Sequence, residues 1–316
     1  MKKSNRCRPV LIRSLLIGMS IFVLSVTGFA QKRAGGKTVV TVNTEMVTNM
    51  EYETFFQDQL VENGSIQNVS KTNLQLSSPV FSNNHLRCSL GGYYTYHHAN
   101  FNSSNILDTN YRIDMGTNHH LMGLSVNAIY MNQLFKRPLT ILTNVRAECY
   151  EQGFGSVTGF LVGMLQLKQT SQSSFGVGLI GLINTTSPFP LFPMFTYRHR
   201  LDEKCFMEIM PPQFHFSYSF DSDNRLTAGI SMDGDRFYIK PNNTSLPETC
   251  LYSRSLMRPE LKYETSLSKE LKLCFRHGGY HVINSKLYRK NSHSELIDMD
   301  TSTGAYWTVQ LVANIF

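Results

Sequence analysis

The chain has 316 residues, of which 17% are charged and 11% are aromatic, and its mean hydropathy is −0.20. A protein built from membrane-spanning helices would be clearly apolar, and a soluble domain usually carries more charge, about a quarter of its residues. The net charge of +7 comes mainly from the first thirty residues. Beyond them 25 basic residues stand against 23 acidic ones, so no basic excess indicates a nucleic-acid partner.

Residues 1–30 have the three parts of a signal peptide. A basic start is followed by an apolar run from Leu15 to Val26, which is too short to span a bilayer as a helix. Gly28-Phe29-Ala30 then places small residues at the positions that a signal peptidase reads. We expect cleavage between Ala30 and Gln31; the alternative is an uncleaved anchor helix.

The segment from residue 31 to 68 has the least regular pattern. Thr38 to Val42 is compatible with a strand, and the acidic stretch Glu51 to Asn63 with a short helix or a periplasmic loop. We therefore expect an N-terminal periplasmic or irregular segment over 31–68. The β-barrel domain is then expected over residues 69–316.

The clearest alternation lies in residues 213–240. Side chains alternate between the two faces of a strand, so one face carries aromatic residues and the other polar ones. The aromatic face is Phe214, Phe216, Tyr218 and Phe220, and the polar face is Gln213, His215, Ser217 and Ser219. Asp221 to Asn224 has turn composition, a second alternating segment follows, and Asp233-Gly234 is typical of a two-residue hairpin. These features predict consecutive antiparallel strands, with the aromatic face of Phe214, Phe216, Tyr218 and Phe220 toward lipid.

About a dozen such segments recur along the chain, most of them near the ten residues that a tilted membrane strand requires. A soluble β-sandwich would also alternate, but its strands seldom carry so many charges on the second face. Tyrosines gather at the expected strand ends, as in an aromatic girdle: Tyr93, Tyr94, Tyr96, Tyr130 and Tyr150. We predict an all-β fold, a single antiparallel up-and-down transmembrane β-barrel of about 12 strands, within a range of 10–14.

The polar faces give the residues expected to line the lumen. They are Arg146, Glu148, Arg198, Arg200, Arg225, Lys262, Glu264, Lys272 and Arg276. Charges of both signs could pair and seal the interior, or could line an aqueous pore. A barrel of about 8 strands is filled by its own side chains and one of about 16 leaves a channel, so both alternatives stay open at this size.

The last expected strand, 305–315, carries Trp307, Val309, Leu311, Ala313 and Ile315 on its apolar face and is followed by Phe316. This ending is similar to that of bacterial outer-membrane barrels, whose final residue is commonly aromatic. Phe316 departs from their usual register by one position. The resemblance implies that Phe316 is an assembly signal and that the barrel-assembly machinery is a partner.

A second resemblance covers roughly residues 70–316. It rests on Pro190-Leu191-Phe192-Pro193, Tyr197, the break at Pro211, the strand from Gly229 to Asp233-Gly234, and His277-Gly278-Gly279-Tyr280. Together these segments resemble a family of outer-membrane β-barrels from Bacteroidetes that has no assigned activity. The resemblance implies a Gram-negative outer membrane, with lipid as the surrounding partner, and no catalytic or binding residues.

Two motifs invite a chemical interpretation. His215 and Ser217 lie two apart on one strand face, as in outer-membrane lipid hydrolases, but on the polar side away from lipid, so we expect lumen lining rather than catalysis. His97-His98 and His119-His120 are adjacent pairs whose members point to opposite faces, so we expect no metal. No motif indicates a cofactor. The five cysteines after residue 30 are expected to stay unpaired, and the alternative is that one pair forms a bridge.

Three functions follow from this pattern. The leading hypothesis is a barrel with a polar lumen that passes small solutes passively. The second is a closed structural or adhesive barrel that presents loops 184–193 and 240–253. The third, which we expect least, is a lipid-modifying enzyme that uses His215 and Ser217.

Overall fold

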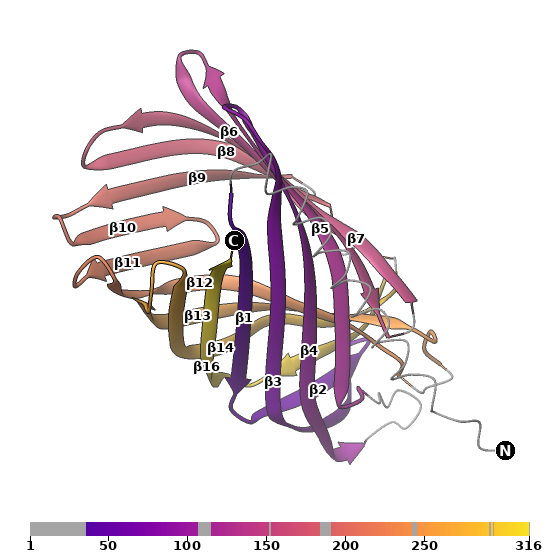
Figure 1. The fold of residues 1–316 in the computed structure, drawn as a ribbon. Helices are drawn as coiled ribbons and strands as arrows, with labels where there is room; N and C mark the ends of the chain where they lie inside the picture. Colours follow the sequence, from indigo (N-terminus) through magenta and orange to yellow (C-terminus); the bar gives the residue numbers. More distant parts are fainter. Residues whose placement is uncertain are drawn as a thin grey trace.

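The computed structural model describes residues 36–106, 115–151, 153–183, 191–241, 245–290, 292 and 294–315. This part of the chain forms one antiparallel sheet of sixteen strands and contains no helix long and apolar enough to cross a membrane (Figure 1). The expected sites at Ala30, Gln31 and Phe316 lie outside the described residues, as do 184–190 and 242–244 of the two expected loops. The strands are β1 Thr38–Val47, β2 Met50–Phe56, β3 Gln59–Ser82, β4 Leu86–Ile106, β5 Asn118–Leu134, β6 Arg137–Tyr150, β7 Gly153–Gln169, β8 Ser173–Ile183, β9 Leu191–Arg200, β10 Cys205–Met210, β11 Gln213–Ser219, β12 Asn224–Ile239, β13 Cys250–Ser266, β14 Leu271–Arg289, β15 Glu295–Thr301 and β16 Gly304–Ile315.

The sheet closes into a barrel because β1 pairs with both β16 and β3. Fourteen strands make the closed cylinder, and β2 and β15 are two additional strands. β1 and the following β2 both pair with β3. β15 and the following β16 both pair with β14. β1 with β2, and β15 with β16, therefore each behave as one bent strand. The predicted closed antiparallel β-barrel is confirmed, with a strand count at the upper end of the expected range.

The N-terminal boundary differs from the prediction. Residues 31–68 were expected to precede the barrel, but β1 closes it and β2 and the start of β3 belong to the same sheet. β2 does alternate, with Met50, Tyr52 and Thr54 buried and Glu51 and Glu53 exposed. Its outer face is acidic rather than apolar, so it does not have the pattern of a lipid-facing strand.

The hairpin expected at Asp233-Gly234 is also absent, because β12 runs through both residues and pairs with β13 from Asn224 to Ile239. Turn composition is only a local preference, and here distant charges override it. Asp233 lies 3.8 Å from the guanidinium of Arg258, and Asp235 is bound by Arg254. The break expected at Pro211-Pro212 is confirmed, because β10 ends at Met210 and β11 begins at Gln213.

The two ends of the barrel are different. The end at which β1 begins and β16 ends is called the turn end. It carries the short connections 83–85, 135–136, 170–172, 201–204, 220–223 and 267–270. The turn predicted at Asp221 is present, with Asp221 accepting the amides of Asp223 and Asn224 at 2.8 Å. Asp202 has the same role in its own turn, where it accepts the amides of Lys204 and Cys205. At the opposite end, the loop end, the strands converge (Figure 1).

Large apolar side chains cover the outside of the barrel. They are exposed on nearly every strand of the cylinder, among them Val42, Leu74, Leu124, Val126, Leu161, Leu179, Phe195, Phe214, Ile230, Leu261, Phe275, Trp307 and Leu311. A soluble monomer rarely exposes so large an apolar surface. Alternation places polar and charged residues on the opposite, inner face.

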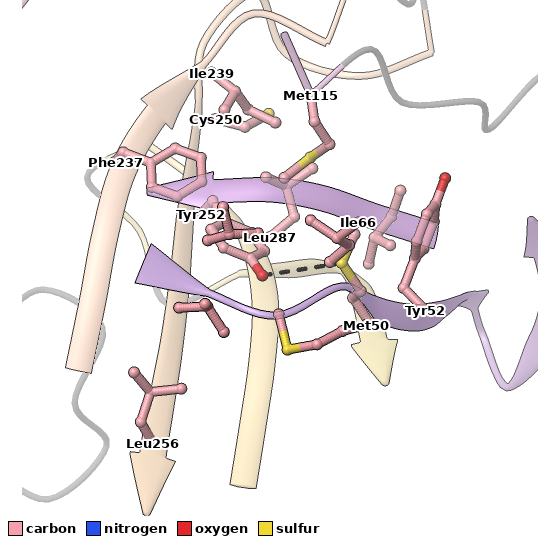
Figure 2. Close-up of a cluster of buried hydrophobic side chains, with 14 of the residues drawn as sticks. Met50, Tyr52, Ile66, Met115, Phe237, Ile239, Cys250, Tyr252, Leu256 and Leu287 are labelled. Carbon is pink, nitrogen blue, oxygen red and sulfur yellow. Dashed lines mark hydrogen bonds between the residues drawn. The ribbon is translucent and has the colours of Figure 1, made fainter. Parts of the chain in front are cut away.

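The largest buried apolar core lies inside the loop end (Figure 2). Met50 of β2, Ile66 of β3 and Leu287 of β14 pack against Phe237 and Tyr252, which come from β12 and β13. Tyr252 donates a hydrogen bond to the sulfur of Met299 at 3.9 Å. Burial of each such side chain stabilises the fold by about 1.5–3 kcal/mol. This core occupies the lumen where an open pore would otherwise emerge.

Candidate functional site: a chamber in the barrel lumen

The last third of β12 crosses the lumen. β11 pairs with β12 only as far as Ser231, so residues 233–239 have β13 as their strand neighbour. Phe237 stacks on His119 of β5 with ring centroids 4.4 Å apart, and it lies 5.3 Å from His97 of β4. Opposite walls of the barrel therefore meet through side chains at this level.

The second face of the same stretch contacts β6 and β7. Tyr238 stacks on Tyr150 at 4.5 Å and donates to the Ser156 hydroxyl at 3.0 Å. Arg236 makes an ion pair with Glu148 and donates to Thr158 at 2.6 Å. We call these contacts of Arg236 and Tyr238 the cross-lumen seam, because they join two walls that share no backbone hydrogen bonds in the described sheet.

Between these walls lies a chamber of about 700 Å³. Its lining comes from β3, β4, β5 and β6 on one side and from β12, β13, β14 and β15 on the other. The volume falls in the range of small-molecule sites. The lining is mostly polar, however, whereas drug-sized ligands usually bind apolar pockets. The chamber is therefore suited to a hydrated or polar solute.

Buried ion pairs form one wall of the chamber. Two nitrogens of Arg254 donate to Oδ2 of Asp235, at 2.9 and 3.2 Å, and Lys71 makes an ion pair with Oδ1. The Arg254 guanidinium also lies over the Tyr280 ring, 5.2 Å from its centre. Because Arg254 takes one oxygen of Asp235 and Lys71 the other, charge-assisted hydrogen bonds hold β12 against both β13 and β3.

A second buried pair lies beside the first. Arg258 donates to both carboxylate oxygens of Glu45, at 2.6 and 3.2 Å, and lies over the rings of Tyr280 and Tyr306. Tyr306 in turn donates to Glu260 at 2.5 Å. These contacts tie β1, β13, β14 and β16 together across the interior.

The residues expected to line the lumen divide into two groups. Glu148 pairs with Arg236, and Lys262 pairs with Glu264 at 3.2 Å. Within the described residues, the remaining six have no carboxylate within 4.0 Å: Arg146, Arg198, Arg200, Arg225, Lys272 and Arg276. Arg276 donates to Gln310 at 3.1 Å, and Arg198 and Arg225 lie over the Phe206 ring at 4.6 and 5.4 Å.

The residues expected to face lipid and the histidine–serine pair lie on opposite faces of β11. Phe214, Phe216 and Phe220 are exposed by 43, 41 and 48%, and Tyr218 packs edge-on against Phe220. Ser217 is buried and its hydroxyl bonds to that of Thr227 at 2.9 Å. His215 lies 3.9 Å from Glu260. A serine nucleophile needs its base within hydrogen-bond reach, and here the serine's bond goes to a threonine.

The histidines and cysteines show no assembled metal site. The described residues contain no group of three or more His, Cys, Asp or Glu that could hold an ion. His97 and His119 point into the core against Phe237, while His98 and His120 bond to Asn118 and Tyr94. Cys88, Cys149, Cys205, Cys250 and Cys274 are free thiols.

Sequence reasoning missed most of the buried ionic wall. Glu45 lies in the segment set outside the barrel, and Lys71, Asp235, Arg254 and Arg258 were not named as lumen residues. The available signal was the alternation of β13, in which Arg254, Arg258 and Lys262 share a face. The turn wrongly predicted at Asp233-Gly234 hid the strand that carries Asp235, and the loop expected over 240–253 ended directly before Arg254.

The closed cylinder, its apolar outer surface and its charged interior define a β-barrel of the membrane-spanning class. No protein-family model and no curated protein matches the sequence.

Solved structures with a similar barrel include three bacterial proteins. One is an outer-membrane channel from Pseudomonas putida F1, with 9% identity, 88% of this chain and 95% of that chain covered, and a TM-score of 0.43. Another is a FadL homologue from Pseudomonas aeruginosa, with 6% identity, 89% and 91% coverage and a TM-score of 0.44. The protease OmpT from Escherichia coli has 8% identity, 88% and 97% coverage and a TM-score of 0.32. At these values the likeness concerns the barrel fold alone.

Proposed function

We propose that this protein is an outer-membrane channel for small polar solutes, closed at its loop end in the conformation described. The observation that supports it most directly is the polar chamber of about 700 Å³ within the lumen. A structural barrel of this width would be expected to fill or fully neutralise its interior. Here six inward cations lack an ion-pair partner in the described part of the chain.

The orientation follows from the connections. Outer-membrane barrels have short periplasmic turns and longer extracellular loops. The turn end therefore faces the periplasm, and the loop end, with its apolar core, faces outward. Solute coming from outside would have to pass the core and the cross-lumen seam before it reached the chamber.

Opening requires displacement of residues 233–239 together with their strand partners 250–256, because residues 233–239 carry Arg236, Phe237 and Tyr238 across the lumen. The seam consists of side-chain contacts, so it can separate without breaking the hydrogen-bond ladder between β12 and β13. Loss of one partner of a buried ion pair is strongly unfavourable, which favours the closed state.

Planar-bilayer recordings test this proposal. The double variant Arg236→Ala/Tyr238→Ala removes the seam and should raise the open fraction at least tenfold over the wild type. Arg87→Ala/Tyr130→Ala makes the same kind of change at the turn end and should leave the open fraction unchanged. Heat-modifiable migration on gels would verify that each variant is folded. Folded seam variants that conduct no ions would contradict a channel.

A second candidate is a closed structural or adhesive barrel, and the apolar core at the loop end favours it. It predicts that neither the wild type nor the seam variant conducts. Under either function we propose that Phe214, Phe216, Tyr218 and Phe220 contact outer-membrane lipid. We also propose that His215 and Ser217 line the lumen and that no reaction is catalysed. Export by a cleaved signal peptide, Phe316-dependent assembly and kinship with the Bacteroidetes family are part of the same proposal.

A further inference from the structure

We propose that the chamber binds a small solute carrying an oxyanion, a carboxylate or a phosphate, and that Arg146 is the residue that holds it. The inference rests on the proposed function, since it names the solute class of the same channel. It depends on one cation of the lining that has no acid within 4.0 Å among the described residues, and on the direction of the field in the lumen beyond it.

The chamber lining carries four cations and four acids, and all but one of these eight groups have an ion-pair partner. Lys71, Arg146, Arg236 and Arg254 face Glu148, Asp233, Asp235 and Glu295 in the lining. Each of these except Arg146 has an opposite charge within 4.0 Å: Lys71 and Arg254 at Asp235, Arg236 at Glu148, Asp233 at Arg258 and Glu295 at Lys286. In the described residues the chamber thus has a single cation without an ion-pair partner.

The guanidinium of Arg146 is also held in a fixed orientation. Its Nε donates to Asn144 at 2.9 Å, and its guanidinium lies over the Tyr93 ring, 5.6 Å from the centre. These contacts fix the plane of the group while the side chain stays exposed to the chamber. A guanidinium positioned in this way presents parallel donors to the two oxygens of a carboxylate or phosphate. Glu148, two positions along the strand, bonds to Arg236 and Thr158 through Oε1. Among the described residues its Oε2 has no hydrogen-bond partner, and Glu148 makes no ion pair with Arg146.

The charges that line the lumen toward the turn end also favour a negatively charged solute. Arg198, Arg200, Arg225 and Lys272 all lack a carboxylate partner among the described residues, and two of them share the Phe206 ring. Walls of low dielectric focus such a field and raise the local concentration of the opposite charge. An oxyanion would therefore be drawn toward the periplasmic half once it is released from Arg146.

The rest of the lining sets the size and polarity of the solute. Asn73, Gln75, Thr95 and Ser125 contribute neutral hydrogen-bonding groups. They suit hydroxyl groups on the solute better than an alkyl chain. A sugar acid or a sugar phosphate fits both the volume and the lining.

The test is isothermal titration of the full-length folded protein in detergent with glucuronate, glucose 6-phosphate and uncharged glucose. The wild type should bind at least one oxyanion and not glucose, and its affinity should fall as salt is raised. Arg146→Gln should weaken that binding at least tenfold, and Arg146→Lys less. Arg137→Gln removes one charge from the exposed start of the same strand and should bind as the wild type does.

Equal binding by Arg146→Gln and the wild type would overturn the site, as would the absence of binding by both oxyanions. The relative response to glucuronate and glucose 6-phosphate decides between carboxylate and phosphate. Bilayer recordings separate this inference from the function on which it rests. Oxyanion binding by a protein that never conducts would refute the channel and keep the site, and conductance without any oxyanion binding would refute the site alone.

Discussion

The ring of Phe237 lies 4.4 Å from the imidazole of His119, in a near-parallel stack at 20°, although six strands separate β12 from β5 in the sheet. A regular cylinder keeps such strands on opposite walls. The contact shows that the barrel is flattened at its loop end, with the two walls in direct apolar contact.

Removal of the Phe237 ring should therefore lower the free energy of unfolding more than removal of a ring on the outer face of the barrel. We expect Phe237→Ala to lower the free energy of unfolding by about 3–5 kcal/mol, because it leaves a cavity in a buried core. Phe216→Ala removes the same atoms from the exposed outer face of β11 and should cost less. Urea unfolding of the protein refolded in lipid vesicles measures both. Equal losses would mean that the loop-end core is not tightly packed.

The Arg258–Glu45 pair gives a second prediction. Glu45→Gln removes the hydrogen-bonded counter-charge of the buried Arg258 guanidinium and leaves only the more exposed Asp233 at 3.8 Å, so we expect a loss of about 3 kcal/mol. Glu45→Gln combined with Arg258→Met removes both charges and should recover part of that loss. A double-mutant cycle by urea unfolding measures the coupling. Additive effects of the two single changes would show that the pair does not form.

Glycine 123 gives a third prediction, because the Tyr93 side chain lies directly over it. A Cβ on Gly123 would come within 2.4 Å of the Ala147 carbonyl and 2.7 Å of the Tyr93 hydroxyl. We expect Gly123→Ala to destabilise the barrel by about 1–3 kcal/mol and to displace Tyr93 from Arg146. Gly163→Ala is the matched control, since nothing lies within 4 Å of the added carbon. Equal stability of the two variants would contradict the packing of Tyr93.

The turn at Asp221 should make a pH-dependent contribution. The pKa of Asp221 lies below its ordinary value because the Asn224 side chain and the amides of Asp223 and Asn224 donate to its carboxylate. A carboxyl whose pKa is lowered by folding stabilises the fold above its unfolded pKa, and this contribution is lost as pH falls through the folded value. Asp221→Ala should therefore destabilise the protein at pH 7 and have a smaller effect at pH 2–3, as seen in urea unfolding at each pH. A difference that grows on acidification would refute this role.

The alternation of β11 and of the first half of β12 was enough to predict their strands, faces and turns. These features are local, since each residue's face follows from its neighbours two positions away. The course of β12 beyond Met232 was not predictable in this way. It depends on Asp235 meeting Lys71 and on Arg236 meeting Glu148, residues 164 and 88 positions distant.

The candidate site was predicted in part for the same reason. Alternation marked Arg146 and Glu148 as inward residues, and the structure places both in the chamber lining. It could not reveal that Glu148 has an ion-pair partner while Arg146 has none among the described residues, because pairing across a lumen depends on how the cylinder is flattened. Glu45 was missed because β2, directly after it in the chain, has an acidic outer face.

The pairing of β1 with β16, in which Thr38 lies opposite Ile315, has a consequence for biogenesis. The two strands that complete the cylinder come from opposite ends of the folded sequence, so no partly delivered polypeptide can complete its ring of hydrogen bonds. A chain lacking residues 304–315 would expose unpaired amides and carbonyls of β1 and β14 to hydrocarbon, at several kcal/mol for each group. Closure of the ring of hydrogen bonds must therefore wait until residues 304–315 have arrived as well as residues 38–47.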